Sequence, residues 1–248
     1  MEGYDSTTYG RAFADTYDDW YDGISDVATT VSLLAEMAEQ MPDLPIVELG
    51  VGTGRLALPL AAKVNPQHVI GIDTSEEMLA VMHGKAPAHP VTTIVGDMID
   101  ALPDGPFALV FVAYNTFFNL RSAEQQRRCF EAVARRLAPG GRFLIEAFVP
   151  DPSLAGDHIE VRELTAERVV LSISRHDADR QSAEGQFVEM TEAGGVRLRP
   201  WSIRYCGTDE LDAMATAAGL SLESRWESFE QDPFTDHSPR HVSVYVCS

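Results

Sequence analysis

Three glycines at alternate positions could hold a ligand against the polypeptide backbone. Gly50, Gly52 and Gly54 lie within the segment 46–61, where a buried apolar run gives way to apolar residues at helical spacing. This order predicts a strand, a tight turn and a helix whose positive end faces the ligand. The spacing differs from the dinucleotide pattern G-x-G-x-x-G, because Arg55 stands where its third glycine would be. The expected ligand is therefore a nucleoside without phosphate and with a charged tail.

A carboxylate follows the next apolar run and could bind a ribose. Asp73 ends the run Gln67–Asp73 and lies roughly 20 residues beyond Gly50, the distance at which α/β nucleoside folds place an acid for the ribose hydroxyls. Capping of the next helix is the alternative role for an acid at this place. Thr74 and Ser75 are both available for that task. We therefore predict that Asp73 accepts hydrogen bonds from the ribose.

The segment VELGVGTGR, residues 47–55, resembles the first motif of class I S-adenosylmethionine (SAM) dependent methyltransferases. The resemblance continues through most of the chain. It implies an α/β fold with a doubly wound, mostly parallel seven-stranded sheet, the Rossmann-like methyltransferase fold, and SAM as the cofactor. It also implies that Glu48 and the three glycines belong to the cofactor-binding residues.

The resemblance implies a place for several more residues around the adenosine. Asp97 would meet the adenine amino group, Met98 would lie beside the ring, and Met78 would lie against adenine from the following helix. Thr74, next to Asp73, belongs to the same cofactor-binding set. A carboxylate in a solvent-facing loop is the alternative for Asp97.

The N-terminal segment is rich in aromatic residues. The pattern YGRAFADTYDDWYD, residues 9–22, resembles the leader of small-molecule methyltransferases such as the amino-sugar N-methyltransferases. That resemblance implies that Tyr9 and Tyr17 reach toward the methionine end of SAM and the substrate. The spacing of apolar residues predicts two helices before the first strand, covering the open side of the cofactor site. The alternative is that the aromatic residues only pack these helices onto the body of the protein.

The apolar run 107–113 predicts the central strand of the sheet, and the loop YNTFFNL follows it. Ligands bind at the carboxyl ends of strands in such sheets, so this loop should face the transferred methyl group. The loop resembles a family segment that often reads N-S-x-x-H-L, but Asn119 stands where many relatives carry histidine. We expect Tyr114 to contact the cofactor and Tyr9 and Asn119 to be the catalytic residues. The sequence offers no compelling general base.

The chain divides into three parts. Residues 1–149 are expected to form the N-terminal helices and the SAM-binding core, 150–205 an antiparallel β insert, and 206–248 the C-terminal part of the core. In the insert, short alternating runs flank Gly194 and Gly195, which is typical of a hairpin turn. The insert would be a lid, a dimer surface or a structural extension of the sheet.

Two helix ends are predicted after the central strand. A helix at 125–138 would end at Pro139 and the two glycines that follow it. A later helix would be capped by Thr208 and ended by Gly219. The remaining strands are expected at 142–149, 220–229 and 241–247, the last two as an antiparallel hairpin at the edge of the sheet.

Composition limits the partners of the protein. The 248 residues carry a formal charge of −19, from 38 acidic and 19 basic side chains, which argues against nucleic acid and anionic membranes. No run approaches the roughly 20 apolar residues of a membrane span, and no secretory signal is visible, so we expect a cytoplasmic protein. The three cysteines form no CxxC pair, and the seven histidines show no metal-ligand spacing. A homodimer through the insert is a further expectation.

These features together predict a SAM-dependent methyltransferase that acts on a small-molecule acceptor. N-methylation is preferred to O-methylation. One alternative is a SAM-binding protein that transfers no methyl group and uses the cofactor as a structural scaffold. Another alternative, an NAD-dependent oxidoreductase, is disfavoured by the glycine spacing.

Overall fold

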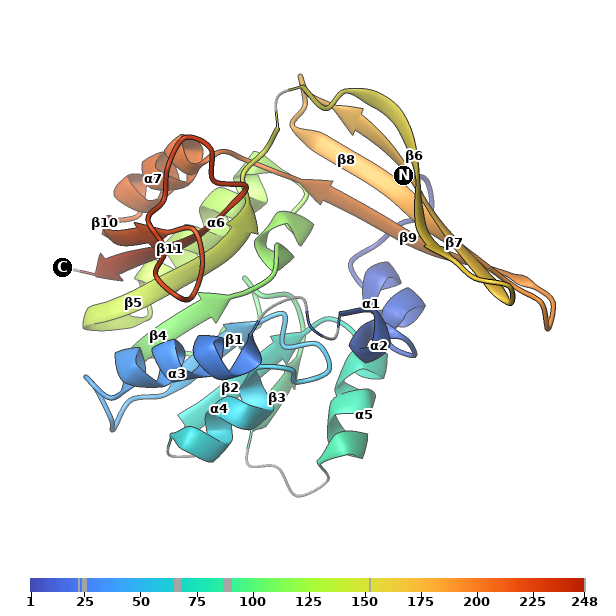
Figure 1. Ribbon diagram of the computed structural model, residues 1–248. Helices are drawn as coiled ribbons and strands as arrows, with labels where there is room; N and C mark the ends of the chain where they lie inside the picture. Colours follow the sequence, from blue (N-terminus) through green and yellow to red (C-terminus); the bar gives the residue numbers. More distant parts are fainter. Residues whose placement is uncertain (22, 24–25, 65–67, 87–90, 152, 248) are drawn as a thin grey trace.

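The computed structural model describes residues 1–21, 23, 26–64, 68–86, 91–151 and 153–247. Seven strands form a central sheet in the order β10-β11-β5-β4-β1-β2-β3 (Figure 1). β1 to β5 run parallel, whereas β11 and β10 are antiparallel to their neighbours. This is the predicted doubly wound, mostly parallel sheet with an antiparallel hairpin at its edge. The strands are β1 (Ile46–Leu49), β2 (Val69–Asp73), β3 (Thr92–Val95), β4 (Phe107–Val112), β5 (Leu137–Phe148), β10 (Leu220–Trp226) and β11 (Arg240–Cys247).

Helices cover both faces of this sheet, which explains the continuous apolar runs of its central strands. Every residue of β1 and β4 is buried. Along β1 the side chains alternate, so that Ile46 packs with the helices of one face and Val47 with those of the other. One face carries α3 (Val27–Ala38), α4 (Ala57–Lys63) and α5 (Glu76–Lys85), and the other α6 (Ala123–Ala134) and α7 (Thr208–Ala217). The start of the predicted strand Gln67–Asp73 lies outside the described residues.

The predicted end of α6 is wrong. The helix ends at Ala134, and the segment around Pro139 already belongs to β5. The chain joins the sheet early because the Arg136 carbonyl accepts the Phe107 N–H at 2.8 Å. A Cβ on Gly141 would lie 2.7 Å from the Phe107 carbonyl oxygen, so this glycine allows two strands to approach closely rather than capping a helix. In α7, likewise, the N-cap is Gly207 and not Thr208.

The N-terminal region holds three helices instead of the predicted two. α1 (Thr8–Phe13) and α2 (Tyr17–Tyr21) are separate and precede α3. The Arg199 guanidinium binds the Ala12 carbonyl, which a continuous helix would use for the N–H of Thr16. The Thr16 N–H donates to the Phe13 carbonyl instead. A side chain from a distant strand therefore takes the place of a helical hydrogen bond.

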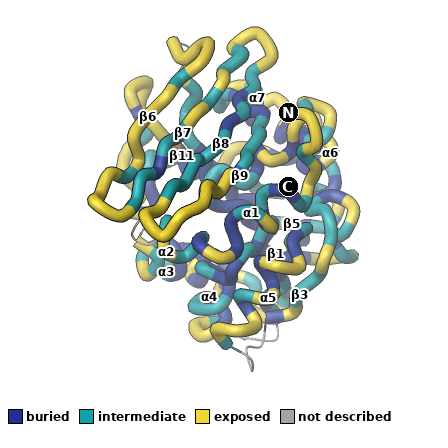
Figure 2. The backbone as a smooth tube through the Cα atoms, turned by 90° about the vertical axis from the view of Figure 1, so that its right-hand side faces the viewer, coloured by how far each residue is buried: buried dark blue, intermediate teal, exposed yellow. Residues whose placement is uncertain are grey.

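The insert forms a second, separate sheet and does not extend the central one. Its strands are β6 (Gly156–Leu164), β7 (Arg168–Asp177), β8 (Ser182–Thr191) and β9 (Val196–Arg204), all antiparallel to their neighbours. Gly194 and Gly195 have φ of +96° and +95° in the predicted turn between β8 and β9. The sheet stands over α1 and α2, and much of β6 is exposed (Figures 1 and 2). Across the described residues, no helix is long and apolar enough to cross a membrane.

Candidate active site

A cavity lies at the carboxyl ends of β1 to β4, where the strand order of the sheet reverses. Ten of the residues predicted from the sequence line it: Tyr9, Tyr17, Gly50, Gly52, Asp73, Thr74, Met78, Asp97, Met98 and Asn119. The lining also includes Tyr4, Asp5, Ser6, Gly10, Ile72, Gly96, Thr116, Leu120, Arg121 and Gln125. Segments far apart in the sequence therefore meet around one space, as the strand ends of this fold require.

The glycine turn leaves one side of the cavity open. Gly50 and Gly52 have φ of +73° and +54°, a region that favours glycine. A Cβ on Gly50 would lie 2.3 Å from Cγ2 of Thr116, whereas a Cβ on Gly52 would meet nothing within 4 Å. Gly54 does not line the cavity, and a Cβ there would lie 2.7 Å from Cγ of Met82. Two glycines thus shape the cavity, and the third lets helices α4 and α5 pack closely.

Asp73 is held firmly at the end of β2. Its Oδ2 accepts the Gly52 N–H at 2.8 Å, and its Oδ1 accepts the Ser75 N–H at 2.9 Å. Burial raises the pKa of this carboxyl, and the backbone N–H donors oppose that shift. Each oxygen keeps a second lone pair, so the carboxylate can still accept two hydroxyl groups. The N-cap of α5 is Ser75, which leaves Asp73 free for such a role.

The far end of the cavity combines a carboxylate with two methionines. Asp97 lines the cavity, and its Oδ1 accepts the Ile99 N–H at 2.8 Å, which fixes its turn. Met78 is buried on α5, and Met98 packs against the core. Thr74 donates to the Ser6 carbonyl at 2.8 Å and ties the N-terminal segment to this wall. The arrangement suits a flat, partly polar ring such as a purine.

Four tyrosines form one cluster beside the cavity. The hydroxyls of Tyr9 and Tyr21 are 3.1 Å apart, and the Tyr21 ring centroid lies 4.6 Å from that of Tyr17 and 5.3 Å from that of Tyr114. Burial raises the pKa of Tyr9 and of Tyr17, and it raises that of Tyr114 to about 12. The phenols are therefore neutral near pH 7 and can donate hydrogen bonds but cannot serve as strong bases.

Three of the predicted cofactor residues do not line this cavity: Glu48, Gly54 and Tyr114. Glu48 is buried in β1, and its Oε2 has no hydrogen-bond partner among the described residues. Burial raises its pKa to about 8, although the charge of Arg55 and a backbone hydrogen bond from Ala57 act in the opposite direction. Tyr114 lines a second cavity together with Glu146 and Arg240.

Asn119 is exposed at the rim of the first cavity. It ends the short 3-10 helix Thr116–Asn119, which follows β4 directly. Its neighbours in the lining, Leu120 and Arg121, come from the same loop. The amide can donate and accept hydrogen bonds but has no basic nitrogen, so this position supplies no general base.

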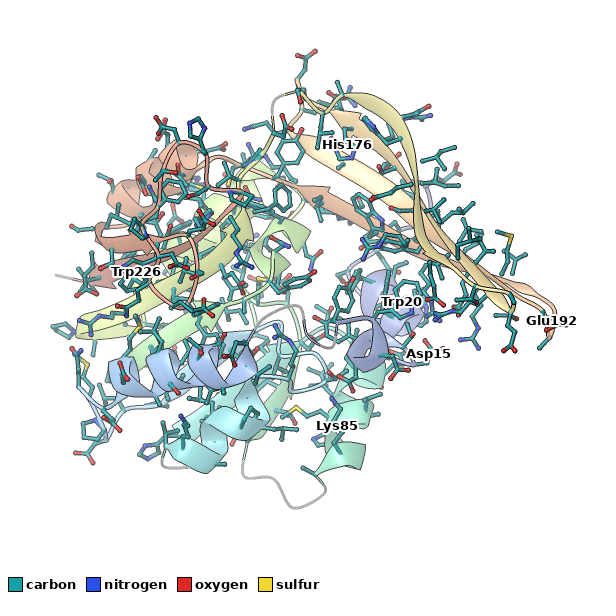
Figure 3. The ribbon with its side chains drawn as sticks, in the orientation of Figure 1. Asp15, Trp20, Lys85, His176, Glu192 and Trp226 are labelled. Atoms are coloured by element: carbon teal, nitrogen blue, oxygen red, sulfur yellow. The ribbon has the colours of Figure 1, made fainter. Side chains whose placement is uncertain are left out.

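The insert packs against the N-terminal helices, which lie beside the site. The Phe187 ring on β8 lies 5.4 Å from that of Trp20 and 5.8 Å from that of Phe13, in edge-to-face contacts. The Arg199 guanidinium on β9 donates to Asp15 Oδ1 at 2.7 Å and to Glu189 Oε2 at 3.0 Å. Trp20 and Asp15 lie on the side of the helices that faces the insert (Figure 3).

Sequence reasoning missed Glu146 and the residues around it. Glu146 is buried near the carboxyl end of β5 and accepts the Tyr114 N–H at 2.8 Å. A signal existed, because it is the only acidic side chain in the apolar run RFLIEAFV, residues 142–149. An acid at the end of a buried strand is a candidate site residue for the same reason as Asp73. No comparable signal marked Arg121 or Gln125.

Among the residues that the structure describes, no group of three or more His, Cys, Asp or Glu side chains could hold a metal ion. Cys129 and Cys206 are buried in the core.

Comparison with known proteins places these features in a family. Residues 46–141 match the family model described as a methyltransferase domain. The demethylmenaquinone methyltransferase of Thermus thermophilus is 34% identical over 71% of this chain and 74% of its own. The structure of the CcbJ methyltransferase from Streptomyces caelestis is similar over 99% of this chain and 100% of its own, with 36% identity and a TM-score of 0.87. The sugar N-methyltransferase KedS8 from a Streptoalloteichus species shares the fold over 98% of both chains, with a TM-score of 0.68 and 22% identity.

Proposed function

The chain belongs to the SAM-dependent methyltransferases, and from this we propose that it transfers a methyl group to an amine nitrogen of a small-molecule acceptor. One observation carries the assignment of the cofactor site. The carboxylate of Asp73 is fixed at the cavity wall by the N–H of Gly52, with lone pairs left over for two hydroxyls.

The residues present fit SAM. Asp73 would accept the ribose hydroxyls, and Gly50 and Gly52 would let the backbone approach the ligand, since Gly52 faces open space. Glu48 does not line the cavity, but we keep it as a proposed contact of the cofactor because its buried Oε2 has no partner among the described residues. Met78, Asp97 and Met98 line the same cavity, and we assign the adenine to this region. Thr74 lines the cavity beside them.

The chemistry needs alignment more than activation. Bound SAM supplies a methyl group on a positively charged sulfur, a leaving group that needs no further activation. The protein has to hold the acceptor nitrogen in line, about 3 to 3.5 Å from the carbon, and to exclude water. Tyr9 and Tyr17 would orient the acceptor through neutral hydroxyls, and the Phe187 contact on the N-terminal helices would keep water out. Asn119 would contribute a neutral amide at the rim.

The preference for nitrogen over oxygen rests on the groups available near the tyrosines. A hydroxyl acceptor is a weak nucleophile unless a base removes its proton, and the raised pKa values of Tyr9 and Tyr17 and the amide of Asn119 provide no such base. A neutral amine already carries a nucleophilic lone pair. The leader pattern of residues 9–22, which resembles that of amino-sugar N-methyltransferases, supports the same choice.

The test is transfer of isotopically labelled methyl from SAM to matched acceptors. A panel of amino sugars and cyclic amines would be compared with analogues in which a hydroxyl replaces the amino group. Methylation of amines at least about ten-fold faster than of the hydroxyl analogues is expected, with the label on nitrogen by mass spectrometry. A protein that binds SAM but labels no acceptor in the panel or in metabolite extracts would support the scaffold alternative, and preferential labelling of hydroxyls would contradict N-methylation.

A further inference from the structure

A second recess lies behind the tyrosine cluster and is built around Glu146. It consists of two adjoining cavities that share Glu146 and Arg240. One is also lined by Tyr114 and Phe148, and the other by Asp26 at the start of α3 and by the segment 228–230. The recess therefore lies between the end of β5, the beginning of α3 and the chain that leads to β11.

Glu146 is presented to this recess in a fixed orientation. Its side chain is only 7% exposed, and its Oε2 accepts the Tyr114 N–H at 2.8 Å. The Glu146 carbonyl accepts the Asn115 N–H at 3.1 Å, and Asn115 Oδ1 accepts the Phe148 N–H at 2.7 Å. Tyr114 and Asn115 both have positive φ, 49° and 63°, so this network holds two non-glycine residues in the left-handed region. The loop and the carboxylate thus fix each other.

The second carboxylate oxygen is left for a ligand. Within the described part of the chain, Glu146 Oε1 accepts no hydrogen bond, although the side chain lines both cavities. Burial raises the pKa of Glu146, because a charge removed from water lacks full compensation. A cationic donor would supply both the missing hydrogen bond and the compensating charge.

The other charges around the recess favour a cation over an anion. Among the described lining residues, Asp26, Glu227 and Glu230 accompany Glu146, and Arg240 carries the one guanidinium. Arg55, whose guanidinium lies 5.9 Å from the centroid of the Tyr114 ring, also acts on the charge of Glu146. Glu227, which accepts a hydrogen bond from Ser238 Oγ at 2.5 Å, is only half-buried, so Glu146 is the buried acid of the recess. Arg240 also acts on the charge of Glu146, and no ion pair between the two is found among the described residues.

Contacts connect this recess to the cofactor cavity. The Tyr114 ring, which lines the recess, meets the Tyr21 ring at 5.3 Å. The Tyr21 hydroxyl lies 3.1 Å from that of Tyr9, and Tyr9 lines the first cavity. These three tyrosines therefore lie between the two spaces. An acceptor held in the recess would reach the cofactor along their rings.

We propose that Glu146 Oε1 binds the ammonium group of the acceptor and takes one of its protons, which leaves the neutral amine whose lone pair accepts the methyl group. The substrates are then small molecules that carry an ammonium group. This inference rests on the proposed function, since it takes the recess as the acceptor side of the same site. It makes Glu146 a specificity-determining residue for cationic acceptors. Arg240, at the same recess, weakens the attraction and would disfavour a second positive charge.

The experiment compares cyclohexylamine with cyclohexanol, which share ring size but differ in charge at pH 7. Binding of each probe to the protein saturated with S-adenosylhomocysteine would be measured by ligand-observed NMR titration. The wild type should bind the amine at least about ten-fold more tightly than the alcohol. Glu146→Gln, which keeps an acceptor for the Tyr114 N–H, should reduce the difference to about two-fold or less. Glu192→Gln removes the same charge from an exposed position in the distant β8–β9 turn and should leave the preference within about two-fold of the wild type.

A second variant keeps the inference testable if Glu146→Gln fails to fold. Arg240 is exposed, and Arg240→Gln should raise the affinity for the amine by about two- to five-fold and leave the alcohol unchanged. Equal binding of the two probes to the wild type, no binding of the amine, or an equal loss in the Glu146 and Glu192 variants would overturn the inference. A lower amine affinity in Arg240→Gln would do the same. Calorimetric titration with S-adenosylhomocysteine distinguishes failure of the proposed function from failure of the Glu146 proposal. If the wild type does not bind S-adenosylhomocysteine, the cofactor site itself is wrong, and not the Glu146 recess alone.

Discussion

The N–H of Gly52 donates to Oδ2 of Asp73 at 2.8 Å, which joins the glycine turn after β1 to the end of β2. The turn follows β1 and Asp73 ends β2, and these neighbouring parallel strands end at the same edge of the sheet. The bond orients the carboxylate toward the cavity and at the same time holds the turn open. The proposed cofactor site therefore depends on both the turn after β1 and the end of β2.

Replacement of Asp73 by asparagine should weaken SAM binding by about 10- to 100-fold. The change removes the charged acceptor of the ribose hydroxyls, and hydrogen bonds to charged groups contribute roughly 1.5 to 3 kcal/mol. Calorimetric titration with SAM measures the effect. The control is Glu77→Gln, which removes one charge from the exposed first turn of the adjoining helix α5. If Asp73→Asn binds as tightly as this control, the ribose assignment is wrong.

A methyl group on Gly52 should impair binding more than folding. In Gly52→Ala the left-handed backbone costs about 1 to 2 kcal/mol, and the new Cβ meets no protein atom within 4 Å but projects into the space assigned to SAM. Gly194→Ala is a matched control, because it also has positive φ and open surroundings but lies in the distant β8–β9 turn. Denaturant unfolding should show similar losses for both variants, and titration should show weakened SAM binding only for Gly52→Ala. Equal SAM affinity in the two variants would place the ligand elsewhere.

The Tyr9 hydroxyl should matter for transfer but little for cofactor affinity. Tyr9→Phe keeps the ring that stacks on Phe13 at 4.3 Å and removes the hydroxyl that lies 3.1 Å from that of Tyr21. Loss of one neutral hydrogen bond of about 1 kcal/mol should lower kcat/KM for methyl transfer by roughly five-fold. Tyr205→Phe, outside the cavity, is the control. A Tyr9→Phe enzyme with unchanged kcat/KM would show that the hydroxyl does not orient the acceptor.

Arg199 should contribute strongly to stability because it joins the insert to the N-terminal helices. Its side chain is 4% exposed and binds both Asp15 and Glu189. Arg199→Met removes the guanidinium that joins these two partners and binds the Ala12 carbonyl, although Asp15 keeps Arg197 and Glu189 keeps Arg168. The free energy of unfolding should fall by about 2 kcal/mol. Arg197 pairs with the same Asp15 but is 65% exposed, so Arg197→Met should cost less than about 1 kcal/mol. Chemical denaturation measures both variants, and equal losses would show that burial of Arg199 has no special effect.

His241 should make the protein less stable as the pH falls below neutrality. Burial lowers its pKa to about 4, and the charge of Arg225 acts in the same direction, while Asp212 opposes it. The unfolded chain takes up a proton near pH 6.5 and the folded protein only near pH 4, so stability from the neutral ring is present above pH 6.5 and is lost toward pH 4. About 2 kcal/mol should be lost between pH 7 and pH 5.

The measurement is the difference in free energy of unfolding between wild type and His241→Gln at several pH values. The difference is needed because Glu48, with a pKa raised to about 8, has the opposite effect: its stabilising protonated state is fully present below about pH 4.5 and is lost as the pH rises through about 8. A gap between the two proteins that stays constant from pH 7 to pH 5 would contradict the assignment to His241.

Local patterns in the sequence were sufficient to predict many of the residues that line the first cavity. Gly50, Gly52 and Asp73 were found because glycine spacing and an acid at a strand end have direct backbone consequences. Predictions failed where a distant partner competes with the local signal. Pro139 and the glycines after it read as a helix end, but the Phe107 N–H draws Arg136 into the sheet. Similarly, Arg199 from β9 divides the first predicted helix.

The sequence alone determined the class of sheet, the glycine turn and the acids at the ends of β2 and β3, because these depend on apolar periodicity and on the backbone freedom of glycine. Only the tertiary structure decided that Tyr114 faces away from the cofactor cavity, that the insert forms its own sheet over the N-terminal helices, and that Glu146 keeps one oxygen free. Each of these depends on pairing between residues far apart in the chain. Burial and hydrogen-bond completion are set by such pairings, and residue type at a single position does not specify them.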